Sequence, residues 1–239
     1  MRLPLWMSTA RAPGFCSAGT MDPDERYIPR SGPMFNARSL AKAEMATNLA
    51  IPLLADGGWP AVTLRTVAAA ANVTPQAIAA WFPSVTAMRR AIAERYGNRW
   101  VDERRAVAGR RLVRTARPAS VDSARSQVAL ALLPGTWLEE VFDGVWLTVA
   151  EAGRWDEVTG LIVAAVQERE RDVVAELLEE QLCDFPSFPD GMGEQRFEQH
   201  VDLVLALVRG LRVARTASHA RMDADRAAVV LDGGLSAAT

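Results

Sequence analysis

Apolar residues recur at intervals of three and four from about residue 38 onward, which is the spacing of one face of an α-helix. The pattern predicts a first helix that ends at Asp56-Gly57-Gly58, and Pro52 inside it should kink the helix or break it locally. No stretch alternates apolar and polar residues as a half-buried strand does, and no internal repeat is found. The hydrophobic pattern therefore predicts an all-α protein.

The stretch TLRTVAAAANVTPQAIAAWF, residues 63–82, predicts two short helices joined by a tight turn. Thr63 and Thr74 are each placed to cap a helix N-terminus, and the proline after Thr74 suits the first helical position. Asn72 lies between the two helices, where a turn needs a residue that tolerates a positive φ. These features predict a small helical unit that presents its second helix outward.

A long helix is expected next, capped by Ser84 and running from Val85 to about Arg117, with a break at Gly97 left open. Beyond Pro118 the apolar spacing predicts four or five further helices. Their expected ranges are about 120–133, 136–152, 155–182, 194–216 and 223–236.

The spacing divides the chain into a three-helix unit at 36–84 and a larger helical unit at 85–239, preceded by residues 1–35. Those first 35 residues are rich in Pro, Gly, Ser and Arg and lack a helical period, so we expect them to be disordered. Met21 and Met34 are therefore candidates for the biological start.

The net charge of −2 hides an asymmetry along the chain. Residues 36–110 carry ten basic and five acidic side chains, whereas residues 111–239 carry 13 arginines and 21 acids. A positive N-terminal block on an acidic body is expected of a phosphate-facing head joined to another module. The alternative is a random fluctuation between the two halves.

Composition is that of a soluble globular protein, with 49% apolar and 23% charged residues. No apolar run approaches the ~18 residues of a membrane span, and the first ten residues lack the apolar centre of a signal peptide. A cytoplasmic location is therefore expected. The acids of QERERD, residues 167–172, are interpreted as a solvated face with ion pairs.

Enzymatic and metal chemistry find little support in the sequence. Cys16 and Cys183 are far apart, and His200 and His219 lack companions at metal-ligand spacing. No phosphate-binding glycine loop, catalytic triad or paired-carboxylate motif stands out. We therefore expect neither a metal site, nor a cofactor, nor an enzyme.

Residues 45–95 resemble the DNA-binding region of the TetR family of bacterial transcriptional regulators, through LLADGGW, AVTLRTVAAAANVT and PQAIAAWFPSVTAM in that order. Two later segments, ALALLPGTWLEEVFDGVWLTVAEAG and DLVLALVRGLRVARTA, are more loosely similar to the ligand-binding body of the family's betaine-regulator-like branch. The resemblance implies an N-terminal three-helix helix-turn-helix DNA-binding domain at 36–84. It also implies a larger helical ligand-binding and dimerisation domain at 85–239.

The chain departs from the family pattern at positions that usually contact DNA. Ala79 stands where many members carry a tyrosine, and Val85 stands where they carry a lysine. Both family residues usually hold phosphates, and their loss weakens the electrostatic part of binding. Pro52 also replaces an ordinary helical residue.

The outward helix carries small residues that would let it lie close to base edges, while flanking cations position it on the phosphates. Ile78 and Phe82 should point into the core, and Gln76 could then bond adenine while Ala77 or Ala80 packs on a thymine methyl. The resemblance places Trp81 where the family has His or Tyr, so its indole N–H could donate to a phosphate. The predicted DNA-binding residues are Arg38, Lys42, Arg65, Thr74, Gln76, Ala77, Ala80 and Trp81, with Arg89 as a further phosphate candidate. The alternative is that Ala77, Ala80 and Trp81 pack against something else.

The helices expected at 155–182 and 194–216 carry apolar stripes, and the resemblance implies that they form a four-helix bundle between two subunits. Gly210 would permit the close approach of another helix. The predicted interface residues are Leu161, Ala165, Val201, Val204, Val208 and Leu211. The alternative is that both stripes fill the core of their own subunit.

An effector cavity is expected inside the larger unit, where aromatic walls with few polar anchors suit an apolar or cationic ligand. The predicted lining residues are Trp100, Leu130, Trp137, Phe142, Trp146, Val163 and Gln167. The alternative is that these aromatic residues are ordinary core.

The sequence thus predicts a homodimeric, ligand-responsive transcriptional regulator that binds double-stranded DNA at a palindromic operator. We interpret it as a repressor released by a small molecule, which must bind the two conformations unequally to act. The alternative function is a helical ligand-binding or protein-interaction module whose DNA-binding head has degenerated.

Overall fold

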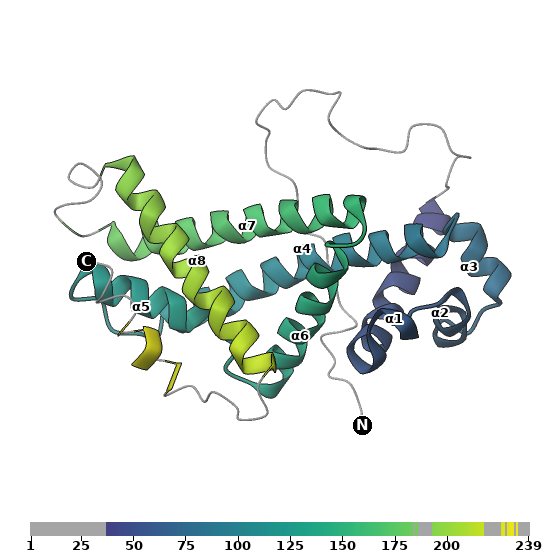
Figure 1. The fold of residues 1–239 in the computed structure, drawn as a ribbon, viewed down its shortest axis with the longest axis horizontal. Coiled ribbons are helices and arrows are strands. Elements are labelled where there is room, and N and C mark those ends of the chain that lie inside the picture. Colours follow the sequence, from purple (N-terminus) through teal and green to yellow (C-terminus); the bar gives the residue numbers. More distant parts are fainter. Residues whose placement is uncertain are drawn as a thin grey trace. The chain divides into compact units, whose positions relative to one another are not determined.

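The computed structural model describes residues 37–183, 185, 193–217, 226–227, 229–231 and 233, and the regular elements in them are all α-helices (Figure 1). The prediction of an all-α protein is confirmed for these residues. The predicted N-terminal extension, 1–35, lies outside them. The helices are α1 (Ala37–Ala61), α2 (Leu64–Ala70), α3 (Pro75–Trp81), α4 (Val85–Leu112), α5 (Val121–Leu132), α6 (Trp137–Ala152), α7 (Glu157–Leu182) and α8 (Glu194–Ala217).

The predicted caps and turn of the α2–α3 unit are confirmed. The Thr63 hydroxyl accepts from the N–H of Thr66, whose own hydroxyl accepts from the Thr63 N–H in a reciprocal capping box. Thr74 caps α3 by accepting from the N–H of Ala77. Asn72 has φ 54°, the left-handed turn conformation that asparagine tolerates.

Helix α1 continues through Pro52, and the residue inside it that leaves helical geometry is Gly58, with φ 61° and ψ −162°. A side chain at that φ would strain the backbone, whereas glycine adopts it freely. The chain therefore turns at the predicted glycine pair, and the local break considered at Pro52 lies at Gly58 instead.

Helix α4 is the element around which the others assemble, because it packs against α1, α5, α6 and α7. It runs without a break through Gly97 and ends at Leu112, a little earlier than the predicted end at Arg117. Its buried side follows helical spacing and consists of Met88, Ile92, Ala93, Tyr96, Gly97, Trp100, Val101, Arg104, Ala108 and Leu112.

At Gly97, α4 closely approaches α6 and α7. A Cβ atom at this position would lie 2.6 Å from Cγ2 of Val166 on α7 and 2.9 Å from Cζ3 of Trp146 on α6. Both distances are shorter than van der Waals contact, so the missing side chain lets three helices meet at one point. Figure 1 shows α4 and α7 running side by side there.

The predicted domain boundary between residues 84 and 85 coincides with the N-cap of α4, since Ser84 accepts from the N–H of Ala87. Helices α1, α2 and α3 pack against one another, and α1 also packs against α4 and α6. Whether 36–84 and 85–239 behave as separate domains stays a prediction.

Replacing Gly97 with alanine should lower the free energy of unfolding by about 1–3 kcal/mol, because the added methyl group overpacks the contact with Val166 and Trp146. Gly144, also inside a helix, is the matched control, because a Cβ there meets nothing within 4 Å. Gly144→Ala should stabilise the protein by up to about 1 kcal/mol. Urea unfolding followed by circular dichroism measures both, and equal effects would contradict the close approach at Gly97.

Candidate nucleic-acid interface and effector site

Helix α3 presents the predicted outward face to solvent. Thr74, Gln76 and Ala80 are exposed, and Ala77 and Trp81 are half-buried. Ile78 is 0% and Phe82 is 6% exposed, so the inward prediction for these two side chains is confirmed. Because the described residues leave this face open, its amide and methyl groups are free to meet a ligand.

Two cations border that face. Arg65 on α2 is exposed, and the Lys42 ammonium on α1 lies 5.9 Å from the centroid of the Trp81 ring. A cation at this distance from an indole is attracted by the ring's negative face. Lys42 therefore sits beside the predicted DNA contacts. The side chain of Arg38, also predicted to bind phosphate, lies outside the described residues.

Arg89 corrects one expectation. Its Nη2 donates to the carbonyl oxygens of Trp59 and Val62, at 2.7 and 3.3 Å, and its guanidinium lies 5.7 Å from the Trp59 ring centroid. The side chain is thus used to fasten the end of α1 to α4, because those carbonyls have left the helical hydrogen-bond ladder. Its Nη2 is thus used for this structural role in place of a phosphate contact.

Two contacts that sequence reasoning missed join the α1–α4 region to α6 and α7. The Trp59 indole Nε1–H donates to the carbonyl oxygen of Thr148 on α6 at 3.2 Å. Arg90 on α4 forms a bidentate pair with Asp156, with its Nε and Nη2 at 3.0 and 2.6 Å from the two carboxylate oxygens. The hydrogen bond from Arg90, followed by those from Thr159, lowers the pKa of Asp156 below its usual range. Asp156 is also the N-cap of α7, so one carboxylate fixes both the start of α7 and its link to α4.

Three of the four aromatic residues predicted to line an effector cavity are buried, and two of them, Trp100 and Trp146, are stacked. The rings of Trp100 and Trp146 lie 5.0 Å apart and are inclined by 19°. Nearby, the Tyr96 hydroxyl donates to the carbonyl oxygen of Phe142 at 2.7 Å, and burial raises the pKa of that hydroxyl. Trp100, Phe142 and Trp146 are thus brought together as predicted, each less than a tenth exposed.

A buried ionic network surrounds this stack. The Asp143 carboxylate accepts from Trp100 Nε1 at 2.9 Å and lies 2.8 Å from Nη2 of Arg104. Arg212 Nη1 pairs with Glu170, and the Arg212 guanidinium lies 4.8 Å from the Trp100 ring centroid. Burial lowers the pKa of Arg104, and the negative charge of Asp143 opposes that shift. We call Arg104, Asp143, Glu170 and Arg212 the ionic core.

The interpretation of QERERD as a solvated face was wrong for Glu170, which is 4% exposed. Glu170 faces α8, where Arg209 and Arg212 compensate its charge. The signal was present in the sequence, because Val163, Val166 and Val173 place Glu170 on the apolar side of α7. Partners some 40 residues away cannot be read from local spacing.

A third buried cation lies between α5 and α8. Nη1 of Arg125 is 3.0 Å from Nδ1 of His200. Arginine can only donate, so Nδ1 is the acceptor and His200 is the neutral tautomer with its proton on Nε2. Burial, together with the charges of Arg125 and Arg196, lowers the pKa of His200.

The remaining predicted effector residues are dispersed. Leu130 and Trp137 are 38% and 56% exposed, so they lie outside the buried stack. Val163 is buried on α7, whereas Gln167 lines a separate groove between α7 and α8 with Arg171, Asp202 and Arg209. The aromatic core thus holds part of the predicted set, and the assignment of an effector site to it stays a prediction.

The predicted dimer stripe on α8 requires a correction. Val201, Val204 and Val208 are 0% exposed and Leu211 is 5% exposed, so these side chains fill the core of their own chain, which was the alternative. On α7, Leu161 is 66% exposed and Ala165 is exposed. Gly210 has open space where its Cβ would be.

The part of the chain that the structure describes also bears on metal binding and on membrane insertion. No group of three or more His, Cys, Asp and Glu side chains is placed to hold a metal ion there. None of the described helices is both long and apolar enough to span a membrane.

No protein-family model and no curated protein matches this sequence. Solved structures do match. A transcriptional regulator from Rhodococcus sp. Rha1 superposes with a TM-score of 0.59 over 82% of this chain and 94% of its own, at 19% identity. A protein assigned to the TetR family from Mesorhizobium loti gives 0.61 over 84% and 96%, at 13% identity. The fold is that of the TetR-family transcriptional regulators.

A third match is a transcriptional regulator from Saccharomonospora viridis solved in complex with choline, with a TM-score of 0.61 over 82% of this chain and 96% of its own, at 16% identity. The resemblance stated from the sequence is therefore confirmed at the level of the TetR fold. The matched proteins are regulators rather than enzymes.

The ionic core should be a strong determinant of stability. Asp143→Asn keeps the size of the side chain but leaves Arg104 and Arg212 with one buried anion fewer, so the free energy of unfolding should fall by about 3–5 kcal/mol. Glu151→Gln removes one partner of the exposed pair with Arg154 and should cost less than about 1 kcal/mol. Urea unfolding of both variants measures the difference, and a loss at Asp143 no larger than that at Glu151 would refute the role of the network.

Proposed function

We propose that this protein is a ligand-responsive transcriptional regulator that binds double-stranded DNA as a homodimer in the cytoplasm and acts as a repressor. The observation that carries the proposal is the open face of α3, where Gln76 and Ala80 are exposed while Ile78 and Phe82 anchor the helix from behind. A rigidly held helix with small outward residues suits approach to base edges in the major groove. The TetR fold supports the same reading.

The proposed division of labour at the DNA follows from side-chain chemistry. Gln76 would read a base edge through its amide, and Arg65 and Lys42 would neutralise phosphates on either side of it. Lys42 and Trp81 would contact phosphates of the same DNA strand, because the Lys42 ammonium lies 5.9 Å from the centroid of the Trp81 ring. Because Ala79 and Val85 have no polar side-chain group, the electrostatic part of the DNA affinity would depend on few cations.

The proposed response to a ligand requires a physical connection between the body and α3. Trp59–Thr148 and Arg90–Asp156 supply two contacts through which a shift of α6 or α7 would reach α1 and α4. A ligand that favours one arrangement of α6 and α7 would thereby change the population of DNA-competent dimers.

The proposed effector would bind at the aromatic stack of Trp100 and Trp146. Such walls suit an apolar or cationic small molecule, and choline, bound in the Saccharomonospora viridis structure, is a cation. In this chain the Arg212 guanidinium already lies over the Trp100 ring. A cationic effector would therefore have to displace Arg212 from its contact with the ring.

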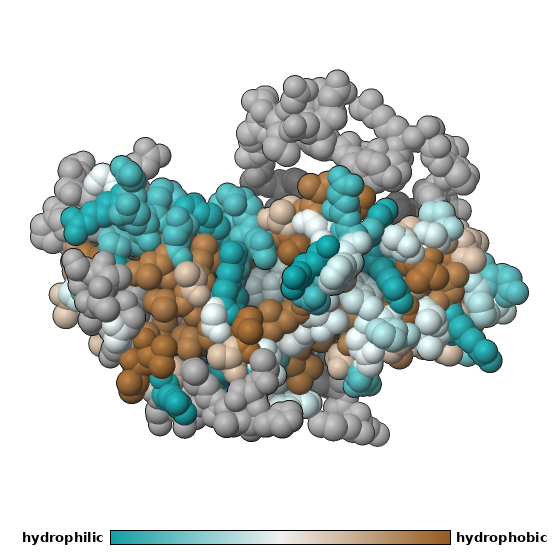
Figure 2. Space-filling view, viewed as in Figure 1, coloured by the Kyte–Doolittle hydropathy of each residue, from teal (hydrophilic) through white to brown (hydrophobic). Residues whose placement is uncertain are grey.

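The proposed dimer interface uses the outward surface of α7 and α8, in place of the buried stripe. Leu161, Ala165 and Val213 are exposed, and Gly210 has room for an approaching helix. In Figure 2 apolar surface gathers over α8, next to a hydrophilic edge along α7. An apolar surface with a polar border is the usual composition of an obligate interface.

A second candidate function is a helical ligand-binding or protein-interaction module whose DNA-binding head has degenerated. The observation that favours it is the low number of cations around α3, with Ala79 and Val85 in place of phosphate ligands. Selection of bound DNA from a random pool distinguishes the two, because a degenerate head would enrich no sequence.

Removing a phosphate contact should affect all DNA sequences equally. Arg65→Ala and Lys42→Ala should each weaken binding to specific and random duplexes and make the salt dependence shallower by about one unit. Gln76→Ala should instead cost about 1–3 kcal/mol on the selected site and leave the salt slope unchanged, because a neutral amide releases no counterions. Binding isotherms at several salt concentrations measure both quantities.

Arg114→Ala serves as the control for these isotherms, because Arg114 is an exposed cation just beyond the C-terminal end of α4, about 40 Å along that helix from the end that follows α3. Its removal should change neither affinity nor slope. If the wild-type protein binds no selected duplex more tightly than random DNA, the proposed function fails and the degenerate head is favoured.

The dimer should dissociate when charge is placed on the outward surface of α7 and α8. Leu161→Glu combined with Val213→Glu should give a folded monomer in sedimentation velocity at micromolar concentration, because each carboxylate would be buried unpaired at the interface. Val113→Glu, at the C-cap of α4 with 87% of its surface exposed, should leave the dimer intact. Val204→Glu should unfold the chain instead. A wild-type monomer at that concentration would contradict both the interface and the palindromic operator.

A further inference from the structure

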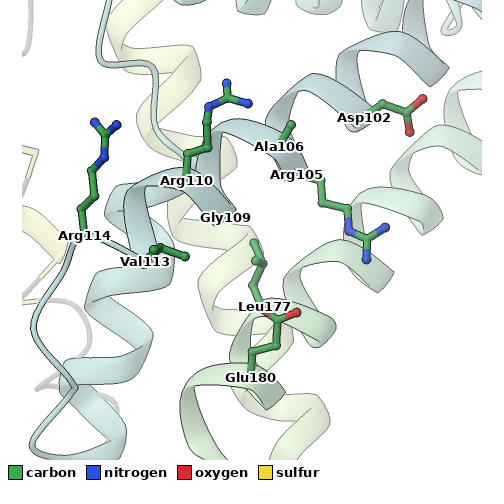
Figure 3. Close-up of a pocket in the computed structure, with 9 residues that line it drawn as sticks. All are labelled: Asp102, Arg105, Ala106, Gly109, Arg110, Val113, Arg114, Leu177 and Glu180. Atoms are coloured by element: carbon green, nitrogen blue, oxygen red, sulfur yellow. The ribbon is translucent and has the colours of Figure 1, made fainter. Parts of the chain in front are cut away.

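A groove of about 670 Å³ lies between the C-terminal half of α4, with the turn that follows it, and the C-terminal end of α7. Its α4 wall is one helical stripe, and two residues of α7 complete it (Figure 3). The lining residues are Asp102, Arg105, Ala106, Gly109, Arg110, Val113, Arg114, Leu177 and Glu180. This stripe lies on a different side of α4 from Trp100 and Arg104, so the groove is separate from the aromatic stack and the ionic core.

The floor of the groove is small and apolar. Ala106 and Gly109 form its α4 side, and a Cβ added to Gly109 would meet nothing within 4 Å. Leu177 closes the floor from α7, and Val113 stands at the rim with 87% of its surface exposed. An exposed valine beside an open apolar floor offers a surface that gains free energy when an apolar group covers it.

Around the floor, positive charge exceeds negative charge among the side chains that are not in ion pairs. Asp102 is held by Arg169, and Arg105 is held by Glu176 at 2.8 Å. Arg110 and Arg114 have no ionic or hydrogen-bond partner among the described residues, and Glu180 is the remaining acid. Figure 3 shows the side chains of Arg110, on α4, and Arg114, in the turn after it, extending in the same direction and away from Leu177, whereas Arg105 extends toward α7.

We propose that this groove binds an organic carboxylate with an apolar body. Arg110 and Arg114, four residues apart at the end of α4 and in the turn after it, reorient toward the floor and hold the carboxylate, because a guanidinium fork matches the two oxygens of that group. The apolar body lies over Ala106, Gly109 and Leu177 and covers Val113. A groove of this volume is within the range of small-molecule sites, and its open side keeps the affinity modest. The assignment does not depend on DNA binding.

Titration calorimetry of the full chain with three probes tests the ligand class. Sodium decanoate below its micellar concentration carries both the carboxylate and the apolar body, decyltrimethylammonium carries the same body with the opposite charge, and acetate carries the carboxylate alone. Decanoate should bind at one site per chain, and the other two should bind at least about tenfold more weakly. Equal binding of decanoate and decyltrimethylammonium, or no decanoate binding at all, overturns the proposal.

Two independent variants locate the site. Arg110→Gln with Arg114→Gln should weaken decanoate binding at least about tenfold, because the charge-assisted hydrogen bonds are lost. Gly109→Leu should abolish it by filling the floor, while leucine is a better helix former than glycine and favours the fold. Gly144→Leu, whose Cβ also meets nothing within 4 Å, and Arg154→Gln are controls that should bind normally. Decanoate binding that survives both groove variants overturns the proposal, and circular dichroism melting confirms that each variant is folded.

Discussion

The constraint on which the body of this protein depends is the neutralisation of buried charge. Arg104 and Arg212 lie almost wholly out of water, and each needs an anion and hydrogen-bond acceptors at fixed positions. Asp143 and Glu170 supply the charge, and the carbonyl oxygen of Leu132 accepts from both arginines, at 3.5 and 3.2 Å. Helices α4, α5, α6, α7 and α8 therefore each contribute a group to one network, and moving any of them changes the pairing of a buried charge.

This arrangement bears on how a ligand could act. The Arg212 guanidinium contacts Glu170, the Leu132 carbonyl and the face of Trp100 at once. A molecule that competes for any of these partners perturbs α5, α7 and α8 together. The nearby α6 carries Asp143, Trp146 and the Thr148 carbonyl that accepts from Trp59. One helix thus touches the ionic core, the aromatic stack and the end of α1.

The sequence predicted what is local and missed what is distant. Helix positions between residues 37 and 217, the caps at Thr63, Thr74 and Ser84, and the left-handed Asn72 follow from interactions within a few residues, and the structure bears them out. Most of the helix predicted at 223–236, by contrast, lies outside the described residues. The buried face of α3 was also predicted, because Ile78 and Phe82 obey helical spacing. The ionic core was not, because Glu170 among charged neighbours resembles a solvated residue until α8 is placed beside it. An apolar stripe such as Val201–Val208 cannot by itself distinguish a subunit core from an interface, since both demand the same side chains. Only the fold shows which side of α8 meets water.

The close contact of α4 with α6 and α7 at Gly97 provides a point about which α4 can tilt. Gly97 lies near the middle of an unbroken helix of 28 residues. The α1–α3 unit is attached near one end of this helix, and the groove between α4 and α7 lies at the other end. At 1.5 Å per residue, each arm is about 20 Å long. A tilt of about 5° around the pivot would move either end by nearly 2 Å, and the two ends in opposite directions. Such a displacement is large compared with the tolerance of a hydrogen bond to a base edge. Because Gly97 has no side chain, a small tilt of α4 caused by a rearrangement of the larger helical unit would displace the α1–α3 unit.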